Sequence, residues 1–119
     1  MDVPRHAIAG RIALLTTRFP GDDESERRII GAMLIESISL DTNWGPSTIV
    51  RGDPRFSLRA PVDALFRYWD FKAGSRRWHE HLYRYISDVE VANYLRALHA
   101  MLTDPRTKAI VDRQLEAIQ

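Results

Sequence analysis

The run Ile29–Ile35, with the sequence IIGAMLI, is the longest apolar stretch of the chain and the feature that most constrains its fold. Seven residues are far too few to cross a bilayer, so the run is expected to be buried inside the protein. It follows the acidic turn GDDESE at residues 21–26, whose charges are favourable at the start of a helix. We therefore expect a helix from this turn to about Leu40, apolar nearly all round and lying at the centre of the fold.

Five further segments show the helical spacing of apolar residues, at 4–19, 61–74, 75–86, 87–102 and 105–118. Residues 41–60 differ, because Gly, Pro and Asn punctuate them and the pieces STIV and RFSL have strand-like composition. The sequence Arg-Gly-Asp-Pro between these pieces is either a hairpin turn or a loop. We predict a mainly α fold over residues 1–119: a compact single-domain bundle of about six helices, with a small β-hairpin at 47–59 left open.

Composition narrows the class of protein. Apolar residues make up 45% of the chain and charged residues 28%, a balance typical of globular proteins. The absence of cysteine excludes a disulfide framework, a thiolate metal site and a thiolate nucleophile. The N-terminal residues place Asp2 where a signal peptide would carry a basic region. We expect a cytoplasmic protein with no membrane association.

The charge of the chain is concentrated in its middle. The net charge is only +1, but residues 51–84 carry eight Lys or Arg against four Asp or Glu. Such an excess can attract a phosphate backbone or an acidic protein. A dedicated DNA-binding domain is usually more basic than this.

Aromatic residues gather in the same region. Seven of the eleven lie between Phe66 and Tyr85, interleaved with cationic side chains. Tyr and Arg are enriched in the hot spots of protein interfaces, and they also suit stacking on single-stranded bases. We predict a binding surface at 67–84, with the candidate residues Arg67, Tyr68, Lys72, Arg76, Arg77, Tyr83 and Arg84. The alternative is a solvated basic face with half-buried tyrosines.

The segment GSRRWHEHLYRY at 74–85 contains the pattern Arg-x4-His-x-Tyr, at Arg76, His81 and Tyr83. This pattern resembles that of the HEPN superfamily, small all-helical domains that include metal-independent ribonucleases of toxin–antitoxin systems. The stretch ESERRIIGAMLIES is similar to an early helix of the mannitol-operon-repressor-like branch of that superfamily. Tyr83 would be the position that an antitoxin partner can modify.

The resemblance implies an endoribonuclease in which Arg76 and His81 are the catalytic pair. His81 would act as general acid or base at the ribose hydroxyl or leaving oxygen, and Arg76 would stabilise the developing phosphorane charge. The two residues lie about 140° apart on a continuous helix, so they would have to meet across a homodimer or at an irregular helix start.

No metal or cofactor site is expected. His79 and His81 would share a face on a strand, but on a helix they point nearly opposite ways. Two functions therefore remain. The first is a small protein that binds a protein or RNA partner, as a regulator, inhibitor or accessory subunit. The second is the HEPN-like ribonuclease.

Overall fold

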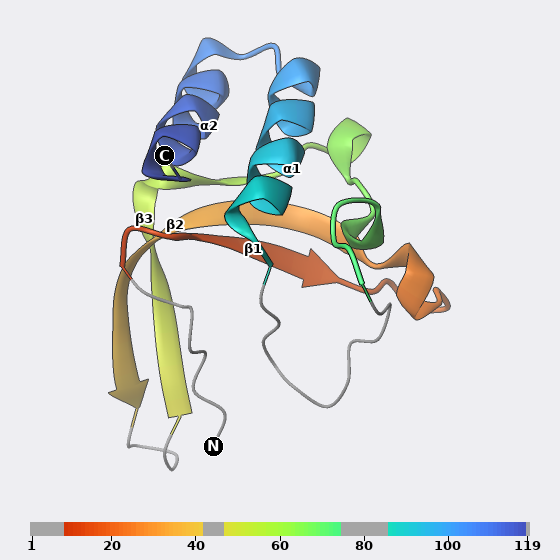
Figure 1. The fold of residues 1–119 in the computed structure, drawn as a ribbon, viewed down its shortest axis with the longest axis horizontal. Helices are drawn as coiled ribbons and strands as arrows, with labels where there is room; N and C mark the ends of the chain where they lie inside the picture. Colours follow the sequence, from red (N-terminus) through yellow and green to blue (C-terminus); the bar gives the residue numbers. More distant parts are fainter. Residues whose placement is uncertain (1–8, 42–46, 75–85, 119) are drawn as a thin grey trace.

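The computed structural model of the protein describes residues 9–41, 47–74 and 86–118. Along the chain, the elements are β1 (Ile12–Thr17), the 3₁₀ turn η1 (Glu24–Glu26), β2 (Arg28–Asp41), β3 (Ser47–Arg59), the 3₁₀ turns η2 (Val62–Ala64) and η3 (Tyr68–Asp70), α1 (Asp88–Met101) and α2 (Pro105–Ile118). The strands of these ranges form one antiparallel sheet in the order β1-β2-β3, and both α-helices lie on the same side of it (Figure 1). The fold is therefore α+β, and the prediction of a mainly α bundle of about six helices is wrong.

The run Ile29–Ile35 is the centre of the sheet rather than a central helix. It belongs to β2, which pairs with β1 along one edge and with β3 along the other. Ile29 and Ala32 are fully buried, as the apolar composition of the run predicts. A short continuous apolar run suits a buried strand as well as a buried helix, so periodicity alone does not separate the two.

Gly31 is a point where the strands approach closely. It pairs with Leu15 of β1 and with Arg59 of β3. A Cβ atom at this position would lie 2.8 Å from the carbonyl oxygen of Leu58, closer than real Cβ contacts. The glycine is therefore required by the sheet geometry and is not merely tolerated in it.

Residues 47–59 form a single strand, not a hairpin. Met33 of β2 pairs with Ser57 and Ile35 pairs with Gly52, so residues 53–56 of β3 lie opposite Leu34 alone. The stretch is a large bulge, in which Asp53 Oδ1 accepts a hydrogen bond of 2.9 Å from the backbone N–H of Arg55. Asp53 and Pro54 of the Arg-Gly-Asp-Pro sequence begin this bulge, and Arg55 and Phe56 complete it. The piece STIV and the last two residues of RFSL, Ser57 and Leu58, pair with β2.

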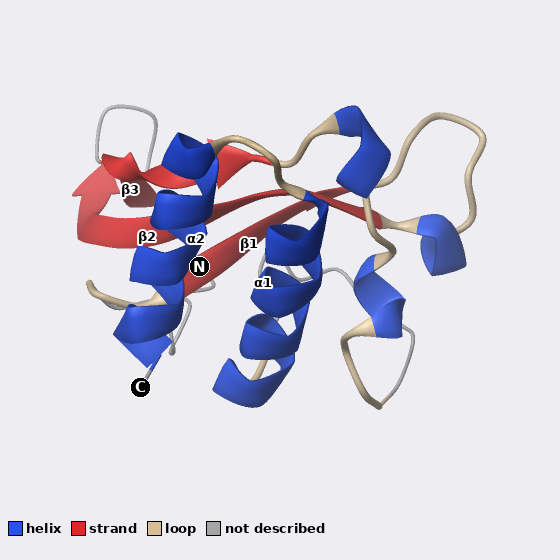
Figure 2. Ribbon diagram, turned by 90° about the horizontal axis from the view of Figure 1, so that it is seen from above, coloured by secondary structure: helices blue, strands red, loops and turns tan. Residues whose placement is uncertain are grey.

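The two C-terminal helices are where the sequence predicts them. Ser87 caps α1: its Oγ accepts from the backbone N–H of Glu90 at 3.2 Å, and Glu90 Oε1 accepts from the backbone N–H of Ser87 at 3.1 Å. The buried face of α1 includes the fully buried Tyr94, Leu95 and Leu98, which form the core together with β2. Figure 2 shows α1 and α2 side by side over the sheet, with the 3₁₀ turns on the side of α1 away from α2.

Gln114 joins α2 to the sheet. Its side chain is fully buried, and Nε2 donates to the carbonyl oxygens of Ala32 at 3.0 Å and Phe56 at 2.8 Å. The first acceptor is in the central strand and the second is in the β3 bulge. One amide group therefore fixes the helix against both strands.

Two other predicted helices are replaced by different structure. The segment predicted at 4–19 contains β1, and the segment predicted at 61–74 contains η2 and η3 with extended residues between them. The helix predicted at 75–86 lies, apart from Ile86, outside the described residues. The extended residues at 65–67 lie along the start of β2, where the backbone N–H of Ile29 donates to Phe66 O at 2.9 Å.

Replacing Gly31 with alanine tests the strand assignment by the sign of its effect. In a helix interior the change would stabilise the protein by about 1 kcal/mol. In the observed sheet the new methyl group meets Leu58 O, so we expect destabilisation of about 1–3 kcal/mol. Urea unfolding measures the difference, with Ser39→Ala on an exposed part of β2 as the control. Stabilisation by Gly31→Ala would contradict the strand.

Replacing Gln114 with leucine tests the link between α2 and the sheet. The change leaves two carbonyl oxygens without their donor, and we expect a loss of about 2–4 kcal/mol in the free energy of unfolding. Glu116→Leu, at an exposed position of the same helix, is the matched control and should change stability by about 0.5 kcal/mol or less. Equal effects of the two variants in urea unfolding would show that the buried amide contributes nothing.

Candidate functional site

An open hollow of about 520 Å³ lies beside the start of β2. Three parts of the chain line it: the loop that follows β1, the first residue of β2, and the stretch that follows β3. The lining residues are Phe19, Arg28, Val62, Asp63, Leu65, Phe66, Arg67 and Asp70.

The stretch that follows β3 leaves the sheet and then returns to it. Ala60 N–H donates to Ile30 O at 2.8 Å, continuing the pairing of β3. The chain then turns through η2, and Phe66 O accepts from the N–H of Ile29. Residues 61–65 therefore form an excursion from the edge of β2, which explains why the side chain of Val62 is 85% exposed.

Arg28 and Arg67 stand opposite each other where the chain returns. They form an isolated antiparallel bridge, and Tyr68 N–H donates to Arg27 O at 2.8 Å beside it. Directly opposed residues of an antiparallel pair carry their side chains on the same face. Two guanidinium groups are thus held side by side by the backbone.

One carboxylate serves both arginines. Glu26 Oε2 accepts from Arg28 Nη2 and from Arg67 Nε, each at 3.1 Å. Arg28 is also held by its Nη1, which donates to Leu65 O at 3.0 Å. The side chains of Arg28 and Glu26 are 29% and 35% exposed, and that of Arg67 is 47% exposed. This Arg28–Glu26–Arg67 group carries one positive charge in excess.

A second polar cluster fixes the acidic turn behind this group. Arg27 Nε and Nη2 donate to the two carboxylate oxygens of Glu24 at 2.6 and 2.8 Å, and Arg27 Nη1 donates to Thr16 Oγ1 at 3.2 Å. Trp69 Nε1 lies 3.0 Å from both Glu24 O and Glu24 Oε2, to which it donates. Hydrogen bonds from Arg27, opposed by partial burial and aided by Trp69, lower the pKa of the Glu24 carboxyl below its ordinary value.

The apolar side of the hollow has a rigid base and an exposed rim. Phe66 packs edge-on against Phe71 and Tyr94, at ring-centre distances of 6.0 and 6.2 Å. Burial of Tyr94 raises the pKa of its hydroxyl. At the rim, Phe19 is 42% exposed and Val62 is 85% exposed. Large apolar side chains are thus presented to solvent next to the two arginines.

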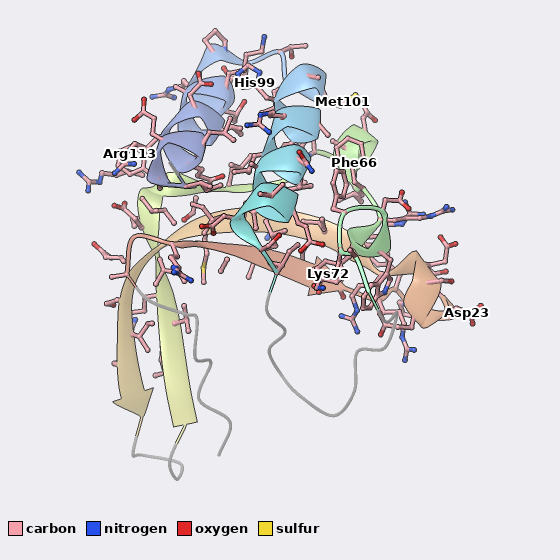
Figure 3. All side chains as sticks on the ribbon, viewed as in Figure 1. Asp23, Phe66, Lys72, His99, Met101 and Arg113 are labelled. Atoms are coloured by element: carbon pink, nitrogen blue, oxygen red, sulfur yellow. The ribbon has the colours of Figure 1, made fainter. Side chains whose placement is uncertain are left out.

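The structure places three of the seven predicted binding residues. Arg67 lines the hollow. Tyr68, predicted as part of the binding surface, is only 2% exposed and belongs to the core. The 3₁₀ turn η3 brings the consecutive rings of Tyr68 and Trp69 inward together, edge-to-face at 4.9 Å, which a helical stripe does not do. Lys72 is half-buried and its Nζ donates to Ala73 O at 2.6 Å; Figure 3 shows it below Phe66, well away from Arg113.

The other predicted site residues lie outside the described residues. These are Arg76, Arg77, Tyr83 and Arg84 of the binding surface, and the pair Arg76 and His81 of the ribonuclease hypothesis. Sequence reasoning missed Arg28, Glu26, Phe19 and Val62. The acidic turn is the available signal: its charges predict the start of a helix, but Glu24 and Glu26 in fact bind arginines.

The pH dependence of stability tests the Glu24 cluster. Because the pKa of folded Glu24 lies below its ordinary value of 4.5, the carboxylate stabilises the protein above that pH, and this contribution is lost as the pH falls through the folded pKa. Glu24→Gln should therefore reduce the slope of unfolding free energy against pH below about pH 5. Urea unfolding between pH 3 and pH 7 measures the slope. Parallel curves for the variant and the parent protein would contradict the assignment.

Comparison with known proteins adds no relative: no family model, curated protein or solved structure matches this chain. Within residues 9–41, 47–74 and 86–118, no helix is long and apolar enough to cross a membrane. The same ranges contain no group of three or more His, Asp or Glu side chains that could hold a metal ion.

Proposed function

We propose that this protein acts by binding a partner protein at the hollow beside Arg67, as a small regulator, inhibitor or accessory subunit does. The observation that carries the proposal is the exposure of Phe19 and Val62 on the rim of a hollow that also contains Arg28 and Arg67. Solvent-exposed apolar side chains around a concave site mark interaction surfaces. Aromatic and arginine side chains are also the residues enriched in interface hot spots.

The charges of the hollow favour a protein partner over RNA. Its lining includes Arg28 and Arg67 as well as Asp63 and Asp70, and Glu26 binds both arginines. The lining therefore carries two basic and two acidic side chains, with no excess of positive charge. Binding of a nucleic-acid backbone depends on an excess of Lys and Arg along the groove. A protein surface, with its mixture of apolar and charged groups, fits the site better.

Two exposed valines provide a matched test of the proposal. Val62 is at the rim and Val89 is at the start of α1, with exposures of 85% and 70%. Glutamate at either position should leave the fold intact, since neither side chain is buried. Val62→Glu should weaken partner binding about tenfold or more, because it places a charge in the apolar part of the interface, while Val89→Glu should bind like the parent protein. The measurement is quantitative affinity capture from an extract of the source organism, followed by titration of the captured protein.

Two results would contradict the proposal. In the first, every captured protein binds the Val62→Glu variant as well as it binds the Val89→Glu variant. In the second, the purified protein cleaves RNA in the presence of EDTA and His81→Ala abolishes the cleavage, which would support the ribonuclease hypothesis instead.

A further inference from the structure

We propose that the hollow takes a short partner segment that presents one carboxylate side chain next to a large apolar side chain. The proposal rests on the function proposed above and specifies the chemistry of the partner. Arg67 is the residue that would bind the carboxylate, and Phe19 and Val62 are the residues that would contact the apolar neighbour.

The first argument is the charge of the arginine pair. Like charges directly opposite each other in an antiparallel pair are destabilising, and here two guanidinium groups are placed opposite each other by the bridge between residues 28 and 67. A single carboxylate oxygen, Glu26 Oε2, accepts from both. A second carboxylate would neutralise the remaining positive charge of this group.

The second argument is the hydrogen-bonding capacity of Arg67. A guanidinium group has five N–H donors in a planar fork, suited to two parallel bonds with a carboxylate. Arg67 uses Nε for Glu26, and within the described part of the chain its Nη1 and Nη2 make no hydrogen bond. The side chain is 47% exposed, so these two nitrogens are accessible to a partner.

The third argument is that the arginine pair is already positioned. Arg28 is held by Leu65 O and Glu26, and the backbone beside Arg67 is held by the hydrogen bond from Tyr68 N–H to Arg27 O. Groups that are fixed before binding lose less conformational entropy when the partner arrives. The hollow, at about 520 Å³, is within the size range of small binding sites.

Asp63 and Asp70 limit the occupant to a segment of low charge. Both line the hollow, and no ion pair within the described ranges involves either of them. Their negative charges oppose a phosphate backbone or a run of acidic residues, while the arginine pair favours a single carboxylate. Repulsive groups of this kind contribute specificity by excluding the wrong partners.

An array of random eight-residue peptides, probed with the full-length protein, tests the inference. The parent protein should enrich peptides that contain Asp or Glu beside a large apolar residue. For an enriched peptide, changing its Glu to Gln should weaken binding about tenfold, as expected for the loss of a charge-assisted hydrogen-bonded pair. Arg67→Glu should transfer the preference to peptides with Lys or Arg. Arg106→Glu, at an exposed position of α2, should keep the preference of the parent protein.

Glu26→Gln separates binding from structural damage. This variant removes the carboxylate that competes for the two arginines, so it should bind the acidic peptides more tightly than the parent protein does. A variant that merely disturbs the site would bind them more weakly. Tighter binding by Glu26→Gln together with weaker binding by Arg67→Glu supports the inference.

The outcomes distinguish this inference from the function on which it rests. Two peptide results would overturn the carboxylate inference and leave a protein-binding hollow. In the first, an enriched peptide binds equally well when its Glu is changed to Gln. In the second, the peptides enriched by the parent protein contain Lys or Arg in place of Asp or Glu. A dimer of the parent protein in light scattering that Val62→Glu converts to monomer would make a second copy the occupant, which also overturns it. If no peptide is enriched and Val62→Glu loses no captured protein, the proposed function itself fails.

Discussion

The hydrogen bonding of β2 on both of its edges is the constraint on which the other features depend. The strand has β1 on one side, while β3 and the returning residues 66–68 share the other side in succession. Because the second neighbour is made of two separate stretches of chain, residues 61–65 have to leave the sheet between them. The hollow lies at this interruption, so its position follows from the pairing of the central strand. The rim residue Val62 is exposed for the same reason.

The charged groups around the start of β2 are arranged in two layers. The inner cluster joins Glu24 to Arg27 and Trp69 and fixes η1 against η3. The outer group joins Glu26 to Arg28 and Arg67 and faces the hollow. In the acidic turn, the carboxylate of Glu24 thus contributes to stability, and that of Glu26, two residues further on, belongs to the site. Two arginines placed directly opposite each other, as Arg28 and Arg67 are, lower the stability of an antiparallel pair. Unfavourable pairings of this kind are expected mainly at functional sites.

The sequence predicts the two C-terminal helices because their signals are local. Each extends over fourteen residues, and α1 has a complete capping box at Ser87 and Glu90. The run Ile29–Ile35 has no such signal, since its partners in the sheet are residues 12–16, 52 and 57–59, and a continuous apolar run does not reveal them. The strand-like composition of STIV and RFSL is informative, because STIV and the last two residues of RFSL do pair in the sheet, but their partner is β2, whose sequence predicts a helix. With β2 predicted as a helix, the two strand-like pieces have only each other as partners, and a hairpin at 47–59 is then the expected but incorrect arrangement.

The candidate site was predictable only in part. Arg67 was identified from its place in a basic and aromatic region, and it lines the hollow. Tyr68 came from the same pattern but is buried, because two consecutive aromatic residues in a 3₁₀ turn both face the core. Glu26 and Arg28 could not be connected to Arg67 without the bridge that brings residues 28 and 67 together.

The hydrogen bonds of Gln114 have a consequence for how the chain can vary. The amide reaches Phe56 O only because residues 53–56 bulge out opposite Leu34, and it reaches Ala32 O in the neighbouring strand at the same time. The length of the bulge and the position of α2 are therefore coupled. An insertion or deletion within residues 53–56 would move one acceptor away from the amide while the other stayed in place. Natural variants of this protein should accept length changes at the turns between elements but keep the spacing from Gly52 to Ser57 constant wherever residue 114 is glutamine.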